Sequence, residues 1–197
     1  MSNHVASDHS APLKVAIILG STRPGRRGEP VAKWVLEHAQ KRTDAKFELL
    51  DLQDYPLPHL DEPIPPSAGK YAGEHTKKWA AKIGSFDAFV FVTPEYNHGT
   101  SGVLKNAIDF VYQEWNNKSA GFVGYGAMGG ILAVESLRLV MGELQVADVR
   151  AQVPISLFTD FVDFQEFKPA AMKEALLTTM LDQVIAWGRA LRALRVP

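Results

Sequence analysis

Apolar and amphipathic stretches alternate along this chain in an order that predicts strands separated by helices. Five apolar runs have the length of strands buried on both faces: 15–19, 47–52, 86–92, 119–124 and 149–155. Five further stretches carry apolar residues at helical spacing: 30–39, 68–84, 104–111, 131–146 and 169–194. This alternation predicts an α/β fold, a doubly wound five-stranded parallel sheet with helices on both faces.

Two segments lack either periodicity. Residues 55–66 contain five prolines, a density that excludes both a helix and a central strand. This segment is either a surface connection or, because long irregular loops are often functional, a wall beside a ligand. Residues 158–167 are acidic and aromatic and are expected to form a loop.

Composition narrows the class of protein. The 197 residues suffice for one α/β domain, expected over 13–197 after a disordered tail at 1–12. A net charge of −1 argues against nucleic acid as a partner, and the absence of cysteine excludes disulfides and thiolate chemistry. The six histidines have no metal-ligand spacing, so no metal site is expected. The polar start is unlike a signal peptide and no apolar run is long enough to span a membrane, which predicts a cytoplasmic protein.

The turn after the first strand has the residues of a phosphate site. Ser21 and Thr22 offer hydroxyl donors, and Arg23, Arg26 and Arg27 offer positive charge just before a helix. Backbone N–H groups and a helix N-terminus favour an anion at such a place. Gly20 and Gly25 have Walker-motif spacing, but arginines stand where that motif has Lys and Ser/Thr. A phosphate monoester that stays intact is therefore expected, with Arg23 as its direct contact; the alternative is a solvated basic turn.

The turn after the third strand offers a surface for a planar ring. Pro94 and Glu95 are followed by the aromatic face of Tyr96 and by Asn97, which both donates and accepts hydrogen bonds. A heterocycle with mixed hydrogen-bonding edges would suit these groups. The alternative is a turn that uses Pro and Asn for ordinary conformational reasons.

The turn after the fourth strand is rich in glycine. The run from Gly124 through Tyr125 and Gly126 to Gly129 fits G-x-G-x-x-G, and Gly130 follows. The run comes too late in the chain to begin a dinucleotide-binding half. Its glycines either let the backbone approach a flat ring or form a tight turn. All three turns follow strands of one parallel sheet, so they are expected to lie at the same edge, around one ligand.

The tryptophans and two charged pairs receive simpler predictions. Trp34, Trp79 and Trp187 lie on apolar helix faces and are expected in the core or at subunit contacts, whereas Trp115, in a polar stretch, is expected near a surface or ligand. Lys105 and Asp109 are expected to form an exposed helical ion pair.

These turns resemble those of the NADPH-dependent FMN reductase family. The resemblance covers about 14–153 and rests on GSTRPGRRG, TPEYNHGTSGVLKNAIDF and YGAMGG. It implies a flavodoxin-like fold and non-covalent FMN, with Ser21, Arg23 and the loop to Gly28 holding the phosphate. It further implies that Pro94 to Asn97 line the isoalloxazine, that Gly126, Gly129 and Gly130 approach its pyrimidine side, and that the chain is a homodimer or homotetramer. Many members have Ser and Asn where this chain has Gly28 and Glu29.

The activity implied is an FMN-dependent NAD(P)H oxidoreductase. Electrons would pass from NADPH (or NADH) through FMN to a small-molecule electron acceptor, a quinone, azo dye, metal oxyanion or free flavin, with ping-pong kinetics. The flavin carries the chemistry, so no catalytic side chain is required. The alternative is a flavodoxin-like electron carrier without reductase activity, although the net charge gives little support for the acidic docking face of a carrier. A receiver domain would need acidic residues where Gly20 and Ser21 stand, and a low-molecular-weight phosphatase would need a cysteine.

Overall fold

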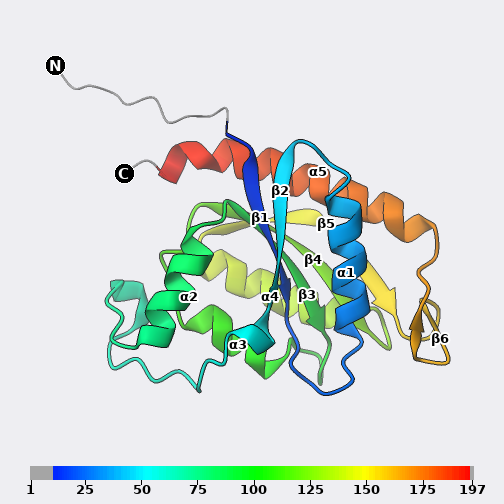
Figure 1. The fold of residues 1–197 in the computed structure, drawn as a ribbon, viewed down its shortest axis with the longest axis horizontal. Helices are drawn as coiled ribbons and strands as arrows, with labels where there is room; N and C mark the ends of the chain where they lie inside the picture. Colours follow the sequence, from blue (N-terminus) through cyan, green and yellow to red (C-terminus); the bar gives the residue numbers. More distant parts are fainter. Residues whose placement is uncertain (1–10, 196–197) are drawn as a thin grey trace.

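A parallel sheet lies at the centre of the computed structural model, which describes residues 11–195 (Figure 1). Its five strands are β1 (Leu13–Leu19), β2 (Ala45–Asp51), β3 (Ala88–Pro94), β4 (Lys118–Gly126) and β5 (Val146–Ser156). They pair in the order β2-β1-β3-β4-β5, and every neighbouring pair is parallel. This is the flavodoxin-like strand order. From β1 the chain adds β2 on one side and then β3, β4 and β5 on the other, so β1 and β3 flank the switch point, where ligands of such sheets bind. The predicted fold class is confirmed.

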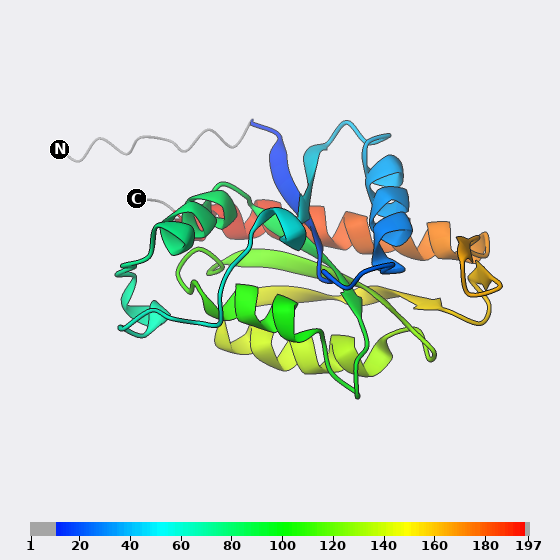
Figure 2. The ribbon, with the colours of Figure 1, turned by 60° about the horizontal axis from the view of Figure 1, so that its bottom comes forward.

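Helices cover both faces of the sheet (Figure 2). One layer contains α1 (Gly28–Ala39) and α5 (Met172–Arg192), and the other contains α2 (Glu74–Gly84), α3 (Gly102–Asp109) and α4 (Ile131–Glu143). Alternate residues of β1 enter different cores, because successive side chains of a strand point to opposite faces: Ile17 packs with α1 and α5, and Ile18 with α2, α3 and α4. Burial of both faces explains why the strands read as continuous apolar runs.

Several element boundaries differ from those predicted. Helix α2 begins at Glu74 rather than near residue 68, because a short 3₁₀ turn at Pro66–Ala68 ends at Gly69, whose φ is 64°. The side chain of Glu62 accepts hydrogen bonds from the N–H groups of Ala72 and Gly73, just before the helix, at 2.7 and 2.9 Å. Strand β5 begins at Val146, within the region predicted as helix.

The acidic and aromatic segment after β5 is not simply a loop. It contains β6 (Phe161–Val162) and β7 (Glu166–Phe167), which pair as an antiparallel hairpin. Ring contacts hold the hairpin to the domain, since Phe167 meets Trp34 edge-on at a centroid distance of 5.7 Å. The hairpin lies beside the start of α1 in Figure 1.

One of the four tryptophan predictions, that for Trp115, needs correction. Trp34 and Trp79 are buried, as expected. Trp115 is fully buried rather than near a surface, because its indole N–H donates to Ile108 O at 3.0 Å and its ring packs edge-on against Phe89. Trp187 is 46% exposed, so of its two predicted places, core or subunit contact, the core is excluded and the subunit contact stays a prediction.

The remaining expectations divide between confirmed and untested ones. Lys105 and Asp109 form the expected exposed ion pair, at 2.7 Å. The predicted tail lies almost entirely outside the described residues. Within 11–195, no helix is long and apolar enough to cross a membrane, and no cluster of acidic or histidine side chains is suited to a metal.

Candidate functional site

The three turns singled out from the sequence meet at the carboxyl edge of the sheet. The hydroxyl groups of Ser21 and Tyr96 lie 3.3 Å apart and join the turn after β1 to the turn after β3. Ser101, which caps the start of α3, donates a hydrogen bond to the carbonyl oxygen of Gly20. The N–H of Glu95 donates to Tyr125 O at 3.0 Å and joins the second turn to the end of β4. One small region therefore contains all three turns.

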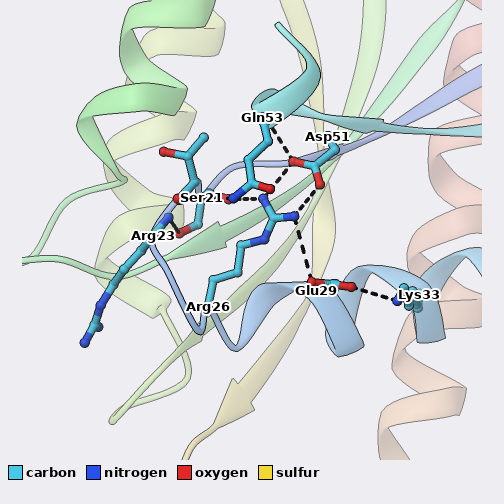
Figure 3. A network of polar contacts seen from close by, with 8 residues as sticks. Ser21, Arg23, Arg26, Glu29, Lys33, Asp51 and Gln53 are labelled. Carbon is cyan, nitrogen blue, oxygen red and sulfur yellow. Dashed lines mark hydrogen bonds and ion pairs between the residues drawn. The ribbon is translucent and has the colours of Figure 1, made fainter. Parts of the chain in front are cut away.

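Arg26 holds the first turn in shape (Figure 3). Its guanidinium forms two hydrogen bonds with the carboxylate of Asp51 at the end of β2, one of 2.7 Å, and donates to Ser21 O at 2.6 Å. The Arg26 side chain is only 7% exposed. The hydrogen bond to Asp51 raises the pKa of Arg26. Burial works against ionisation of Asp51, yet the bond from Arg26, the bond from Gln53 N–H and the charge of Arg26 together outweigh it and lower the pKa of Asp51. Arg26 thus has a structural partner, and sequence reasoning did not identify Asp51.

Arg23 and Arg27 remain available to a ligand. Arg23 is exposed and extends away from the Arg26 network in Figure 3. Among residues 11–195, no side-chain ion pair involves either arginine. Pro24 and Gly25 form the centre of the turn, in which the N–H of Arg26 donates to Arg23 O at 3.1 Å and Gly25 has a φ of 65°. Helix α1 begins directly after it and has no side-chain cap, so its first N–H groups also face this place.

A buried tyrosine hydroxyl adds a further polar group. Tyr125 is 5% exposed, and its hydroxyl has no hydrogen-bond partner among the described residues. The absence of a side chain at Gly28 makes room for this hydroxyl, since a Cβ there would overlap it. Burial raises the pKa of Tyr125, so the group stays protonated and can donate. An unpaired buried donor is costly, which favours a ligand oxygen beside it.

Glu95 has a second role that its position in the sequence did not indicate. Its carboxylate accepts hydrogen bonds from the N–H groups of Leu132 (3.0 Å) and Ala133 (3.4 Å) in the first turn of α4. Glu95 therefore caps a helix and ties the second turn to the third. Asn97 lies in the exposed tight turn closed by Tyr96 and Gly99, where its φ of 50° suits Asn.

The glycines of the third turn separate into two groups. Gly126 lines the cleft. Gly129 and Gly130 have φ angles of 79° and 69° and face the protein's own chain. A Cβ on Gly130 would lie 2.5 Å from Tyr125 N, and one on Gly129 would lie 2.8 Å from the Cβ of Pro154. Of the two interpretations of this glycine run, the tight turn therefore accounts for Gly129 and Gly130.

A cleft of about 230 Å³ opens between these turns. Pro94 and Tyr96 line it, whereas Ser21, Thr22 and Gly28 do not: Ser21 is hydrogen-bonded to Tyr96, and Thr22 and Gly28 are next in sequence to the lining residues Arg23 and Arg27. Two of its residues, Leu157 and Phe164, come from the segment after β5 and were missed from the sequence. The sequence feature that could have identified them is an aromatic segment directly after a strand whose carboxyl end lies at this edge.

The proline-rich segment 55–66 contributes none of the residues that line the cleft, which favours its interpretation as a surface connection. The lining residues are Arg23, Gly25, Arg26, Arg27, Pro94, Glu95, Tyr96, Tyr125, Gly126, Leu157 and Phe164.

A sheet of this order, with free cationic and hydroxyl donors at its switch point, defines a flavodoxin-like protein, a class that binds phosphate-bearing cofactors at this edge. Residues 13–160 match the model of the family described as NADPH-dependent FMN reductase. The chain belongs to this family and is an FMN-dependent NAD(P)H oxidoreductase.

Two relatives and one solved structure show what this chain is similar to, the structure in its fold alone. An NAD(P)H-dependent FMN reductase of Schizosaccharomyces pombe is 44% identical over 135 residues, which are 68% of each chain. A 2-hydroxy-1,4-benzoquinone reductase of a Burkholderia species is 27% identical over 187 residues, covering 90% of this chain and 97% of the relative. The solved structure of a flavoenzyme NAD(P)H:(acceptor) oxidoreductase from Paracoccus denitrificans has a TM-score of 0.68 at 22% identity, over 90% of this chain and 98% of that one.

Proposed function

We propose that the cleft between the three turns holds FMN, with the phosphate at the turn after β1. The observation that carries this proposal is the set of unpaired donors there: the guanidinium groups of Arg23 and Arg27, the hydroxyl of Tyr125 and the uncapped start of α1. Their chemistry suits a phosphate dianion, because charge-assisted hydrogen bonds are the strong ones. Ser21, a buried residue, adds a hydroxyl.

The planar part of the cofactor lies against the second and third turns in this proposal. Pro94, Tyr96 and Gly126 give that side of the cleft flat and small surfaces. Glu95 fixes the spacing of the two turns through its bonds to α4 rather than acting as an acid or base. When bound, FMN supplies the two-electron chemistry, accepting a hydride from NAD(P)H and reducing a second acceptor.

The acceptor is a small planar molecule of the quinone class. A single cleft of about 230 Å³, used by NAD(P)H and by the acceptor in turn, would give the ping-pong order. In the overall reaction NAD(P)H loses a hydride, and the quinone gains two electrons and two protons, one of them from solvent. If Arg23 alone binds the FMN phosphate, Arg27 is left for the 2′-phosphate of NADPH, which favours NADPH over NADH. Neither nucleic acid nor a membrane takes part, and a cytoplasmic location would give access to reduced nicotinamide.

The outer surface of α4 supports a homodimer or homotetramer. Leu132 is 43% exposed and Leu139 is 81% exposed, although the opposite face of the same helix is buried in the core. A groove of about 490 Å³ runs beside Leu139, between α3 and α4. Exposed apolar surface of this kind commonly marks a subunit contact. Leu139→Glu is expected to shift the species measured by light scattering to a smaller mass; an unchanged mass would reject this surface as the contact.

One experiment separates the enzyme from an electron carrier of the same fold. The purified protein, supplied with FMN, should bind it and then oxidise NADPH with a naphthoquinone and no other protein present. Stoichiometric FMN binding without NADPH oxidation would favour the carrier. Failure to bind FMN would reject the proposal altogether. A sample of FMN without protein provides the background rate.

A further inference from the structure

The segment after β5 places a pair of aromatic rings at the rim of the cleft, one before the hairpin and one in its turn. Phe164 lines the cleft, and Phe158 meets it edge-on at a centroid distance of 5.4 Å. The two side chains are 52% and 64% exposed. Large apolar rings at the mouth of a ligand cleft present area to a ligand rather than to the protein's own core.

The backbone at Phe164 is strained. Its φ is 56°, and that of Asp163 is 49°, so both central residues of this hairpin turn are left-handed. Asp tolerates this conformation, but a bulky residue such as Phe is an outlier there. Strain of this kind persists where the surroundings fix it, and it commonly marks a functional position.

A buried carboxylate fixes the hairpin in place. Asp160 is fully buried and accepts hydrogen bonds from the N–H groups of Ser156 (2.8 Å) and Ala170 (3.2 Å), one on each side of the hairpin. The N–H of Leu157 donates to Gly126 O at 3.0 Å, so the same segment is bonded to the third turn. The two rings are therefore held at a set distance from the cofactor cleft.

Burial separates the members of the cleft into a floor and a rim. Pro94, Tyr125 and Gly126 are buried, whereas Phe164 is half exposed at the opening. The ligand that stays bound needs the floor, and the ligand that enters and leaves each turnover meets the rim. We propose that Phe164, supported by Phe158, forms the aromatic wall of the acceptor subsite and selects planar aromatic acceptors. This inference rests on the proposed function.

The test compares a planar acceptor with one that needs no ring contact. In FMN-loaded protein, Phe164→Asn removes the ring and keeps a residue that accepts a positive φ. It is expected to raise the KM for a naphthoquinone about tenfold, as for loss of one aromatic contact. The rate with ferricyanide, a small hydrophilic anion that needs no ring contact, is expected to change less than about twofold. Phe164→Tyr, which keeps the ring, should retain the wild-type KM.

Two measurements without turnover accompany the kinetics. Binding of 1-naphthol, a redox-inert planar ring, should weaken about tenfold in Phe164→Asn when followed by difference spectroscopy. The melting temperature should rise by about 2–4 °C, because relief of backbone strain is expected to stabilise the fold. The matched control is Val162→Ala, which alters an exposed residue of the same hairpin outside the cleft lining and should change neither quantity.

The outcomes distinguish this inference from the proposed function. Three results would each overturn the acceptor role. The first is that Phe164→Asn impairs the reactions with naphthoquinone and ferricyanide equally, and the second is that it binds FMN more weakly. The third is that Phe164→Tyr is as impaired as Phe164→Asn. Wild-type protein that neither binds FMN nor oxidises NADPH would instead overturn the proposed function. Wild-type activity together with a variant that lacks any quinone-specific change rejects the inference alone.

Discussion

Arg23 and Arg26 lie three positions apart in one turn, and the structure gives them different roles. Arg26 is 7% exposed and bonded to Asp51 and to Ser21 O, whereas Arg23 is exposed and has no ion pair within the described chain. Arg23→Ala is therefore expected to weaken FMN binding with little change in stability. Arg26→Ala is expected to destabilise the fold first, with any loss of FMN binding following from a displaced turn.

The magnitudes follow from the contacts. Loss of one charge-assisted hydrogen bond to the phosphate in Arg23→Ala costs about 1.5–3 kcal/mol, or roughly a tenfold to 150-fold rise in Kd. In Arg26→Ala, the carboxylate of Asp51 keeps the N–H of Gln53 at 3.0 Å but loses its counter-charge while its side chain is 23% exposed. Breaking such a partly buried pair costs about 2–4 kcal/mol. For a chain of this size, the melting temperature should fall by about 4–16 °C.

Two assays measure the two effects separately. Quenching of FMN fluorescence at about 0.15 M salt gives the Kd, so that surface electrostatics are screened as in a cell. Scanning calorimetry of the protein without FMN gives the melting temperature. Lys33→Ala is the control, since it removes an exposed cation paired with Glu29 on α1 at 2.7 Å and should change neither value much. The reasoning is refuted if Arg23→Ala binds FMN normally, or if Arg26→Ala melts with the wild type.

Three further predictions concern kinetics, the third turn and acid stability. Initial rates at varied NADPH and quinone should give parallel double-reciprocal lines, and intersecting lines would contradict the use of one cleft in turn. Gly130→Ala should destabilise strongly because its Cβ would lie 2.5 Å from Tyr125 N, whereas Gly142→Ala, with open space, should not; equal melting temperatures would reject this explanation. Burial opposes ionisation of Asp87, but bonds from Arg192 and from Lys14 N–H prevail and hold its pKa below the usual range. The ionised Asp87 therefore stabilises the fold above its unfolded pKa of about 3.9, and this stabilisation is lost as the pH falls through the folded pKa. In Asp87→Asn, the free energy of unfolding should depend less on pH below about pH 4 than it does in the wild type. An unchanged dependence would contradict the assignment.

The sheet could be predicted from the sequence because both of its faces are buried. Strands such as β3 consist of apolar residues only, apart from Thr93, so neither their existence nor the carboxyl edge they share was ambiguous. The boundaries that failed depended on local contacts without periodicity. The start of α2 depends on Gly69 and on Glu62, a carboxylate more than ten residues upstream. Trp115 was misjudged because its polar neighbours face outward while its ring turns into the core.

The sequence predicted which turns form the candidate site, but not the contacts that join them. Residue types and position after a strand were enough to single out the turns after β1 and β3. The pairing of Arg26 with Asp51 spans 25 positions and depends on β1 and β2 being neighbours, which no single segment encodes. The capping of α4 by Glu95 spans 37 positions. The role of Phe164 depends on a hairpin whose two-residue strands are too short to produce a pattern.

The central claim is that the turn after β1 binds the phosphate of FMN. The most direct measurement compares the Kd of FMN with that of riboflavin, which has the same ring and no phosphate, in the wild type and in Arg23→Ala. FMN should bind the wild type at least about a hundredfold more tightly, as expected for several charge-assisted bonds, and Arg23→Ala should remove much of that difference. Equal affinities for the two flavins in the wild type would contradict the account.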